Sequence, residues 1–328
     1  MKKAIKIIGA ILVVFLIGVI VFLKTAANDK SIYISTGFEK DVLIKVDQTQ
    51  TTRTEVAAYL SDMVSEYEKL FGSEIWNEYM DGKPFEEYIL EQIKGRLTRV
   101  KCMNQVAQSR GIVLSNLEEQ NISKAAAEYV ASVAKEDISK FNITEQAVAD
   151  MYRSMLMADK LFDDLTYEVD TEISEDEARV ITIQYIRCDS PQAAASVKNR
   201  LDNGESFSAL IKENNAYEYE YELRRGELPE NFEEAAFNLV TGEISDVIET
   251  DAGCYILMCI NEYDKMKTAS NKERMIQENK LARFNEIFEP YEAKLYAEYN
   301  EKLWETISVK DTIHSSVGFQ EAYDKYLK

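Results

Sequence analysis

The sequence of 328 residues contains a single histidine, His314, and only four prolines and twelve glycines. One histidine leaves little scope for a catalytic triad or for other histidine-based acid–base chemistry. The scarcity of glycine and proline argues against a loop-rich all-β protein, whereas abundant alanine, glutamate, lysine and leucine favour helix. The sequence also lacks a metal-ligand cluster, a nucleophile elbow and a phosphate-binding loop. We therefore expect neither a metal nor a cofactor.

The four cysteines, Cys102, Cys188, Cys254 and Cys259, do not form a C-x-x-C pair. This spacing argues against a zinc site and against a thioredoxin motif. Cys254 and Cys259 are five residues apart on an expected strand, so their side chains should face opposite sides of a sheet. We expect all four to be buried thiols.

The charge of the chain is unevenly distributed. The first 24 residues contain four lysines and no acid, whereas the rest carries 34 basic and 58 acidic residues, a formal charge of −24. Such a body would repel nucleic acid, whose binding depends on neutralising phosphates. We therefore expect no nucleic-acid partner, and the simplest reading of the charge is solubility.

Residues 7–23 form an uninterrupted run of 17 apolar or glycine residues, preceded by Lys2, Lys3 and Lys6. A membrane-spanning helix needs roughly 17–25 such residues, and the positive flank stays inside. We therefore expect residues 1–24 to be a single-pass membrane anchor with the bulk of the chain on the extracytoplasmic face. A cleaved signal peptide is the alternative, because residues 25–27 are small; the protein would then be secreted.

The exported part is expected to begin with a tether and a short strand over residues 25–50, followed by a helical domain over 51–170. Capping boxes are expected at Thr52 with Glu55 and at Ser115 with Glu118. The second of these opens a helix expected to reach about Lys140. Thr144 opens a further helix with helically spaced apolar residues.

Beyond residue 170 the apolar period changes from that of helices to that of strands. Ser174 and Glu177 mark the boundary of a compact α+β domain over residues 171–264. Residues 217–223 alternate tyrosine with glutamate up to Leu223, which is typical of a strand with one aromatic face. Either this stretch is an edge strand whose glutamates prevent edge-to-edge pairing, or it binds client peptides by strand addition or aromatic contact. Residues 265–328 are then expected to be helical, with a long helix over about 270–306, and to pack back on the N-terminal bundle.

Four short segments of the α+β domain resemble, in order and spacing, motifs of parvulin-type peptidyl-prolyl isomerases. They are residues 203–207 (NGESF), 232–237 (FEEAAF), 242–245 (GEIS) and 253–256 (GCYI). The arrangement of helices, α+β domain and helices is similar to that of SurA- and PrsA-like extracytoplasmic foldases. The resemblance implies an α+β protein in which a helical chaperone-like bundle, completed by C-terminal helices, carries an inserted antiparallel-sheet domain.

The resemblance also implies a site that binds unfolded or exported polypeptide clients and isomerises X-Pro bonds. Leu228 and Phe232 fall where the family places the residues of its apolar proline slot. The two family histidines fall at Gln184 and Tyr255, and neither is histidine here. Gln184, Leu228, Phe232 and Tyr255 are therefore the candidate substrate-binding residues, and the catalytic residues are unknown.

These replacements leave two functions open. The first is a membrane-anchored foldase that holds clients and isomerises their prolines. The second is a non-catalytic scaffold at the cell envelope that uses a degenerate parvulin module to bind one partner. The sequence also leaves open whether the protein is a monomer or a homodimer.

Overall fold

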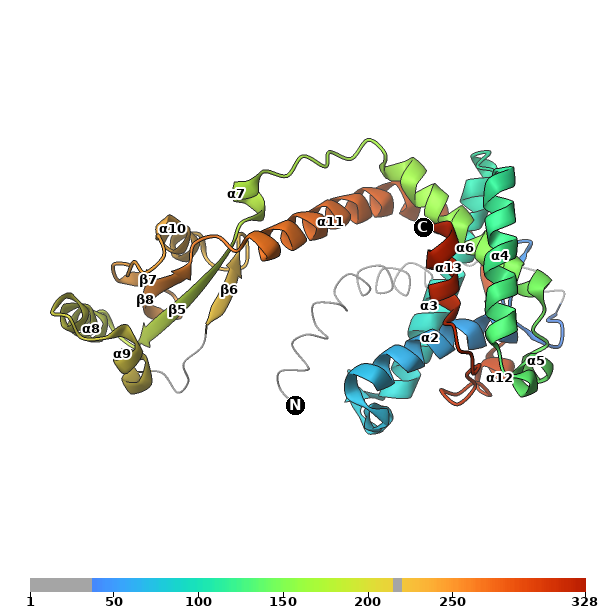
Figure 1. Ribbon diagram of the computed structural model, residues 1–328, viewed down its shortest axis with the longest axis horizontal. Coiled ribbons are helices and arrows are strands. Elements are labelled where there is room, and N and C mark those ends of the chain that lie inside the picture. Colours follow the sequence, from blue (N-terminus) through green and yellow to red (C-terminus); the bar gives the residue numbers. More distant parts are fainter. Residues whose placement is uncertain (1–36, 215–219) are drawn as a thin grey trace. The chain divides into compact units, whose positions relative to one another are not determined.

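The computed structural model describes residues 37–214 and 220–328, which fall into two compact units. The first unit contains the described residues 37–168 together with Ala282–Lys328, and the second is Val169–Leu281. The first is mainly helical and the second mixes helices with a sheet, so the chain has the expected α+β class (Figure 1). Within the described ranges, no helix is long and apolar enough to cross a bilayer. The expected anchor, residues 7–23, lies outside those ranges.

The first unit is a bundle of helices with a small sheet. Its elements in chain order are β1 (Val42–Val46), β2 (Thr49–Thr52), α2 (Arg53–Phe71), η1 (Ser73–Asn77), β3 (Tyr79–Met80), β4 (Lys83–Pro84), α3 (Phe85–Ser109), α4 (Asn116–Ser132), α5 (Lys135–Phe141), α6 (Glu145–Thr166), the end of α11 (Lys265–Glu292), β9 (Ala297–Tyr299), α12 (Glu301–Trp304) and α13 (Phe319–Leu327). Helix α6 packs against both α3 and α4, and α13 packs against α4 and α2. The residues that follow the inserted unit thus complete the core of this bundle.

The predicted helix starts agree with the structure where side chains cap the backbone. Ser115 and Glu118 form a reciprocal capping box at α4, and the Thr144 hydroxyl accepts the Ala147 amide at α6. At α2 the Thr52 hydroxyl accepts the amide of Glu55. These caps satisfy amides that have no partner inside the helix, which is why they can be read from local sequence.

The expectation of one helix from Ser115 to about Lys140 is wrong. Helix α4 ends at Ser132, and a new helix, α5, begins at Lys135. Between them Val133 pairs with Ser315 as a β-bridge, and the Ala134 amide donates to the carbonyl of His314. A distant segment of the chain therefore interrupts the helix by offering extended backbone as a partner.

The long helix expected over residues 270–306 is also too long. Helix α11 ends at Glu292, two residues after Pro290, and residues 297–299 form strand β9. This strand pairs with β1, which becomes the central strand of the order β2-β1-β9. The pairing of β1 with β2 has a bulge between Val42 and Ile44, and both Leu43 and Ile44 are fully buried in the core.

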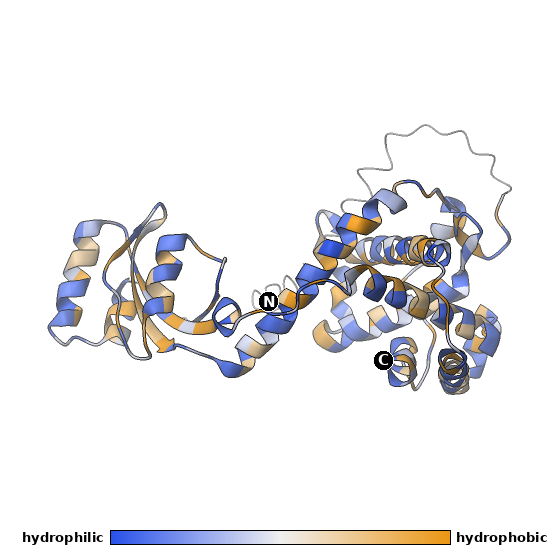
Figure 2. Ribbon diagram, turned by 90° about the horizontal axis from the view of Figure 1, so that it is seen from above, coloured by the Kyte–Doolittle hydropathy of each residue, from blue (hydrophilic) through white to orange (hydrophobic). Residues whose placement is uncertain are grey.

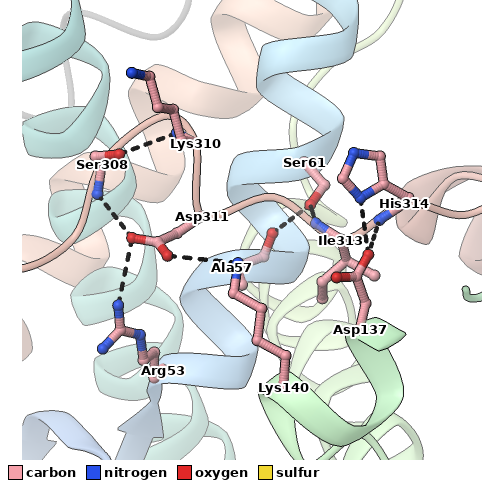
Figure 3. A network of polar contacts seen from close by, with 10 residues as sticks. All are labelled: Arg53, Ala57, Ser61, Asp137, Lys140, Ser308, Lys310, Asp311, Ile313 and His314. Carbon is pink, nitrogen blue, oxygen red and sulfur yellow. Dashed lines mark hydrogen bonds and ion pairs between the residues drawn. The ribbon is translucent and has the colours of Figure 1, made fainter. Parts of the chain in front are cut away.

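The segment between α12 and α13 is fixed to α2 and α5 by polar contacts (Figure 3). The Asp311 carboxylate lies 3.3 Å from Arg53, and the Ile313 amide donates to the Ser61 hydroxyl at 2.7 Å. The Asp137 carboxylate accepts both the backbone amide and the ring Nδ1 of His314, each at 2.8 Å. This segment therefore has several separate attachments to the bundle.

The Asp137–His314 contact predicts an acid-sensitive component of stability. Burial raises the pKa of the Asp137 carboxyl, but the hydrogen bonds from the amide and ring of His314 lower it by more. The pKa of Asp137 therefore lies below its ordinary value. A carboxyl with a lowered folded-state pKa stabilises the fold above its unfolded pKa of about 3.9, and this stability is lost as the pH falls through the folded-state pKa. We expect Asp137→Asn to lower the urea midpoint at pH 7 and to reduce its acid dependence.

The neighbouring exposed Glu136 provides the control, because it also lies in the first turn of α5. Glu136→Gln should leave the pH dependence of the midpoint unchanged. An equal effect of the two substitutions would show that helix-end charge, and not the His314 contact, causes the acid sensitivity.

The second unit is a four-stranded antiparallel sheet covered by helices on both faces. Its elements are α7 (Glu175–Ala178), β5 (Val180–Cys188), α8 (Pro191–Asp202), α9 (Phe207–Asn214), β6 (Tyr221–Arg224), α10 (Glu230–Asn238), β7 (Ile248–Thr250), β8 (Gly253–Asn261) and the start of α11. The strand order is β6-β5-β8-β7. Figure 2 shows that the helices carry both hydrophobic and hydrophilic residues, as expected for helices that cover a core on one side.

The sheet separates two small cores. Helices α8 and α9 pack on one face with Ile186 and Ile256, and α10 packs on the other face with Ile183 and Leu257. Cys254 belongs to the first core and Cys259 to the second, and both are free thiols, as predicted from their spacing. Of the tyrosine–glutamate stretch, the structure describes strand β6; residues 215–219 lie outside the described ranges.

Candidate functional site

The α10 face of the sheet carries a row of aromatic side chains. Tyr255 on β8 lies between Phe232 on α10, with ring centroids 5.5 Å apart, and Tyr185 on β5, with centroids 5.9 Å apart. Both pairs are edge-to-face, an arrangement that aromatic rings favour. Tyr221 on β6 pairs with Ile183, which belongs to the same core. We call Tyr221, Tyr185, Tyr255 and Phe232 the aromatic row.

The row is partly open to solvent. Phe232 is buried with 6% of its surface exposed, Tyr221 is 39% exposed, and Tyr185 and Tyr255 are intermediate. Burial, and next the nearby Glu227 carboxylate, raise the pKa of the Tyr221 phenol above its ordinary value. Its hydroxyl is therefore protonated at neutral pH and can donate a hydrogen bond.

Leu228, a second predicted site residue, packs against the same core beside the aromatic row. It lies in the loop between β6 and α10, which the Glu233 carboxylate fixes by accepting the amides of Gly226 at 3.0 Å and Leu228 at 2.9 Å. Arg225 holds the other side of the loop: it pairs with Asp176 at 2.9 Å. Gly226 has a φ of +84°, a conformation that glycine adopts without strain.

Gln184 does not join the other predicted site residues. Side chains along a strand alternate between faces, and Gln184 has the parity of Ile186, which packs against α8 and α9. Its cross-strand partner Met258 packs against that same core. Three of the four candidates, Leu228, Phe232 and Tyr255, thus gather on the α10 face, and Gln184 lies on the opposite face.

Sequence reasoning missed Tyr185, which takes the place on β5 that was assigned to Gln184. The register between β5 and β8 shifts between Thr182 and Ile183 because β8 carries an extra residue there, whereas the side chains of β5 keep their regular alternation. A signal was nevertheless present in the sequence: Ile181, Ile183 and Tyr185 share one parity, and all three contact the α10 core.

A loss of the loop anchor at Glu233 should weaken the site without unfolding the unit. Glu233→Gln keeps one acceptor oxygen, so one of the two amide hydrogen bonds is lost and the other loses the strengthening charge. We expect a stability loss of about 1 kcal/mol and a severalfold weaker affinity for a proline-containing peptide. Urea unfolding and peptide titration would measure the two effects.

Glu234→Gln is the matched control, because Glu234 is the next residue of α10 and is exposed. It should leave peptide affinity unchanged. Equal affinities of the Glu233→Gln variant and the native protein would show that the position of Leu228 does not affect binding.

A shallow depression of about 610 Å³ lies next to this site, between α10 and the segment 243–249. Its walls include Asn231, Ala235, Leu239 and Ile244, and none of its lining residues belongs to the aromatic row. The chemistry available on the row is that of an aromatic surface with phenol hydroxyls. Such a surface can hold an apolar ring and donate hydrogen bonds to an adjacent peptide group.

A family model supports the parvulin character of this unit. Residues 186–261 match the family model "Rotamase: PPIC-type PPIASE domain". The match covers β8, with Tyr255, and helix α10, with Phe232. The match thus includes Tyr221, Phe232 and Tyr255 of the aromatic row, whereas Tyr185 lies one residue before the matched range.

The chain as a whole is similar to PrsA. It is 24% identical over 287 residues to the foldase protein PrsA of Caldanaerobacter subterraneus subsp. tengcongensis, and the aligned region covers 82% of this chain and 90% of that protein. It is also 24% identical over 256 residues to a parvulin-like PPIase of Rickettsia bellii, covering 69% of this chain and 86% of that protein. The resemblance to parvulin-type, PrsA- and SurA-like foldases predicted from the sequence is confirmed.

Solved structures were also matched, with low superposition scores. The PrsA structure from Lactococcus lactis has a TM-score of 0.34 at 15% identity and covers 84% of this chain and 100% of that one. The PrsA structure from Bacillus cereus has a TM-score of 0.32 at 17% identity and covers 73% and 94%.

Proposed function

We propose that this protein is an extracytoplasmic foldase that binds unfolded polypeptide and catalyses rotation about X-Pro bonds on the aromatic row. The single observation that carries the proposal is the convergence of Phe232, Tyr255 and Tyr185 beside Leu228, within a domain that matches the PPIC-type family. The similarity to foldase protein PrsA along most of the chain supports a client-binding role for the whole molecule.

Isomerisation of this kind needs no covalent intermediate. The barrier to rotation about a peptide bond is about 18–20 kcal/mol because the amide is conjugated. An enzyme lowers the barrier by binding the twisted amide more tightly than the planar one. In this proposal Phe232, Tyr255 and Leu228 hold the proline ring. The phenol hydroxyls of Tyr185 and Tyr221 donate hydrogen bonds near the amide.

Refolding of a client whose slow phase is limited by proline isomerisation tests the catalytic part. The full chain should accelerate this phase at substoichiometric concentration. The variant Tyr185→Phe/Tyr221→Phe keeps the rings and removes two hydroxyls, so it should bind peptide but accelerate refolding less. A slow phase that the native chain leaves untouched would refute isomerase activity.

A second function is favoured by the absence of histidine at Gln184 and Tyr255, where the resemblance places the family's histidines. In this alternative the domain is a non-catalytic module that binds one partner at the cell envelope. Suppression of aggregation for several unrelated unfolded proteins would contradict it. A single partner bound in fixed stoichiometry, together with an unaffected proline-limited phase, would support it.

We propose that residues 1–24 anchor the protein so that residues from 25 onward lie outside the cytoplasm. The support is the apolar run 7–23 with its lysine flank. Protease added to intact cells or protoplasts should digest the chain. N-terminal sequencing of the mature protein separates an anchor from a cleaved signal, and protection from external protease would refute the location.

A further inference from the structure

A shallow groove of about 430 Å³ lies in the first unit, between the first half of α3 and the region around α12. No residue of the parvulin-type domain contributes to it. The lining residues are Pro84, Glu86, Glu87, Leu90, Glu91, Lys94, Glu301, Trp304, Glu305 and Ile307. These residues are called the α3–α12 groove below.

The floor of the groove is apolar and partly exposed. Leu90 and Trp304 are intermediate in exposure, and Ile307 is buried with 6% exposed. Trp304 and Leu90 both pack at the edge of the main core, so their positions are set by the fold. An indole and two branched aliphatic side chains can accept an apolar side chain of a partner.

The rim of the groove is strongly acidic. Five glutamates and one lysine, Lys94, line the groove, and the nearby Lys83 pairs with two of these glutamates. Counting both lysines, the groove has a formal excess of three negative charges. The groove already binds one cation of its own chain, the Lys94 ammonium, which contacts the Glu301 carboxylate at 2.8 Å. This ammonium also lies 4.4 Å from the ring centroid of Tyr299 and 5.4 Å from that of Trp304. Carboxylate plus aromatic face is a favourable environment for an ammonium or guanidinium group.

We propose that the α3–α12 groove binds an extended polypeptide segment in which lysine or arginine alternates with apolar residues. The apolar residue would contact Leu90 and Trp304, and the basic residues would contact the glutamate rim. Charge complementarity selects this occupant over a second copy of the protein, because the chain beyond residue 24 carries a formal charge of −24 and would be repelled. This is a binding site additional to the aromatic row, with its own preference.

Trp304 allows a direct test, because the full chain has only two tryptophans. In the full-length protein with Trp76→Phe, the emission of Trp304 would be followed while a short peptide alternating lysine with leucine is added. We expect a saturable spectral shift whose apparent affinity falls as sodium chloride is raised, because salt screens exposed charges. A matched peptide with glutamate in place of lysine should give no saturable shift.

Two double variants test whether the peptide binds in the groove. Glu87→Gln/Glu305→Gln in the groove should weaken lysine-peptide binding by about threefold or more, because each exposed contact contributes modestly. The control Glu66→Gln/Glu286→Gln removes the same charge from exposed positions outside the groove and should leave binding of the lysine peptide unchanged. Circular dichroism would confirm that both variants are folded.

Charge reversal provides the decisive result. Glu87→Lys/Glu305→Lys should weaken binding of the lysine peptide and strengthen binding of the glutamate peptide. Equal responses to the two peptides in the native protein, or equal losses in the groove and control variants, would overturn the proposal. Because no residue of the aromatic row is changed, proline-limited refolding of a client without basic residues should be unaffected, which separates this proposal from the isomerase function.

Discussion

Phe319→Ala is expected to lower the free energy of unfolding of the helical unit by about 3–5 kcal/mol, the usual cost of removing a buried phenylalanine. The Phe319 side chain is 2% exposed and lies at the start of α13. Its ring stacks on Tyr152 at 4.7 Å between centroids and contacts Tyr129 at 5.3 Å and Tyr59 at 5.5 Å. These three tyrosines come from α6, α4 and α2, so the cavity would open where three helices meet α13.

Urea unfolding followed by tryptophan emission measures this effect, because Trp76 and Trp304 both belong to the helical unit. Lys325→Ala is the control: Lys325 also lies on α13 but is exposed, and its ion pair with Glu128 at 2.7 Å should contribute at most about 1 kcal/mol. An unfolding free energy that Phe319→Ala leaves within about 1 kcal/mol of the native value would show that α13 is not part of the cooperative core.

Tyr255→Ala is expected to reduce the affinity of the second unit for a proline-containing peptide by about tenfold or more, equivalent to about 1.4 kcal/mol. Tyr255 is the central ring of the aromatic row and contacts both Phe232 and Tyr185. Its removal takes away contact area for a proline ring and also the two edge-to-face pairs that hold its neighbours. Calorimetric titration with a peptide containing one X-Pro bond would measure the loss.

Gln184→Ala distinguishes the observed geometry from the placement inferred from family motifs. Gln184 has the parity of the opposite sheet face, so its truncation should leave peptide affinity unchanged. Tyr185→Ala, one residue further along β5, should weaken binding in the same direction as Tyr255→Ala. A loss caused by Gln184→Ala but not by Tyr185→Ala would show that the aromatic row is not the binding surface.

Features of the fold that depend on neighbouring residues could be predicted from the sequence. The capping box predicted at Ser115 involves residues three positions apart and is present in the structure, and at Thr52 the hydroxyl half of the predicted box is formed. The break of the helix at Val133 and strand β9 could not be predicted. Each exists because the backbone pairs with a segment more than 150 residues away in the chain, at Ser315 and at β1 respectively.

The candidate site, too, could be predicted in part. Phe232 and Leu228 could be placed near Tyr255 because short motifs fix the order of α10 and β8. The family motif placed Gln184 in the site by its position in the sequence alone. Along β5 the side chains alternate, and Tyr185 has the parity of Ile181 and Ile183, which face α10, whereas Gln184 has the parity of Ile186.

The helical unit is made from both ends of the described chain, with the parvulin-type unit inserted between them. During synthesis, the inserted unit is complete once residue 281 has emerged, whereas the helical unit still lacks α13. Until Phe319 has emerged, Tyr59, Tyr129 and Tyr152 have no phenylalanine ring to cover them. We therefore expect a stage of synthesis in which the smaller unit can fold while the larger unit still exposes an incomplete core. A ribosome that stalls before Phe319 would hold the protein at that stage.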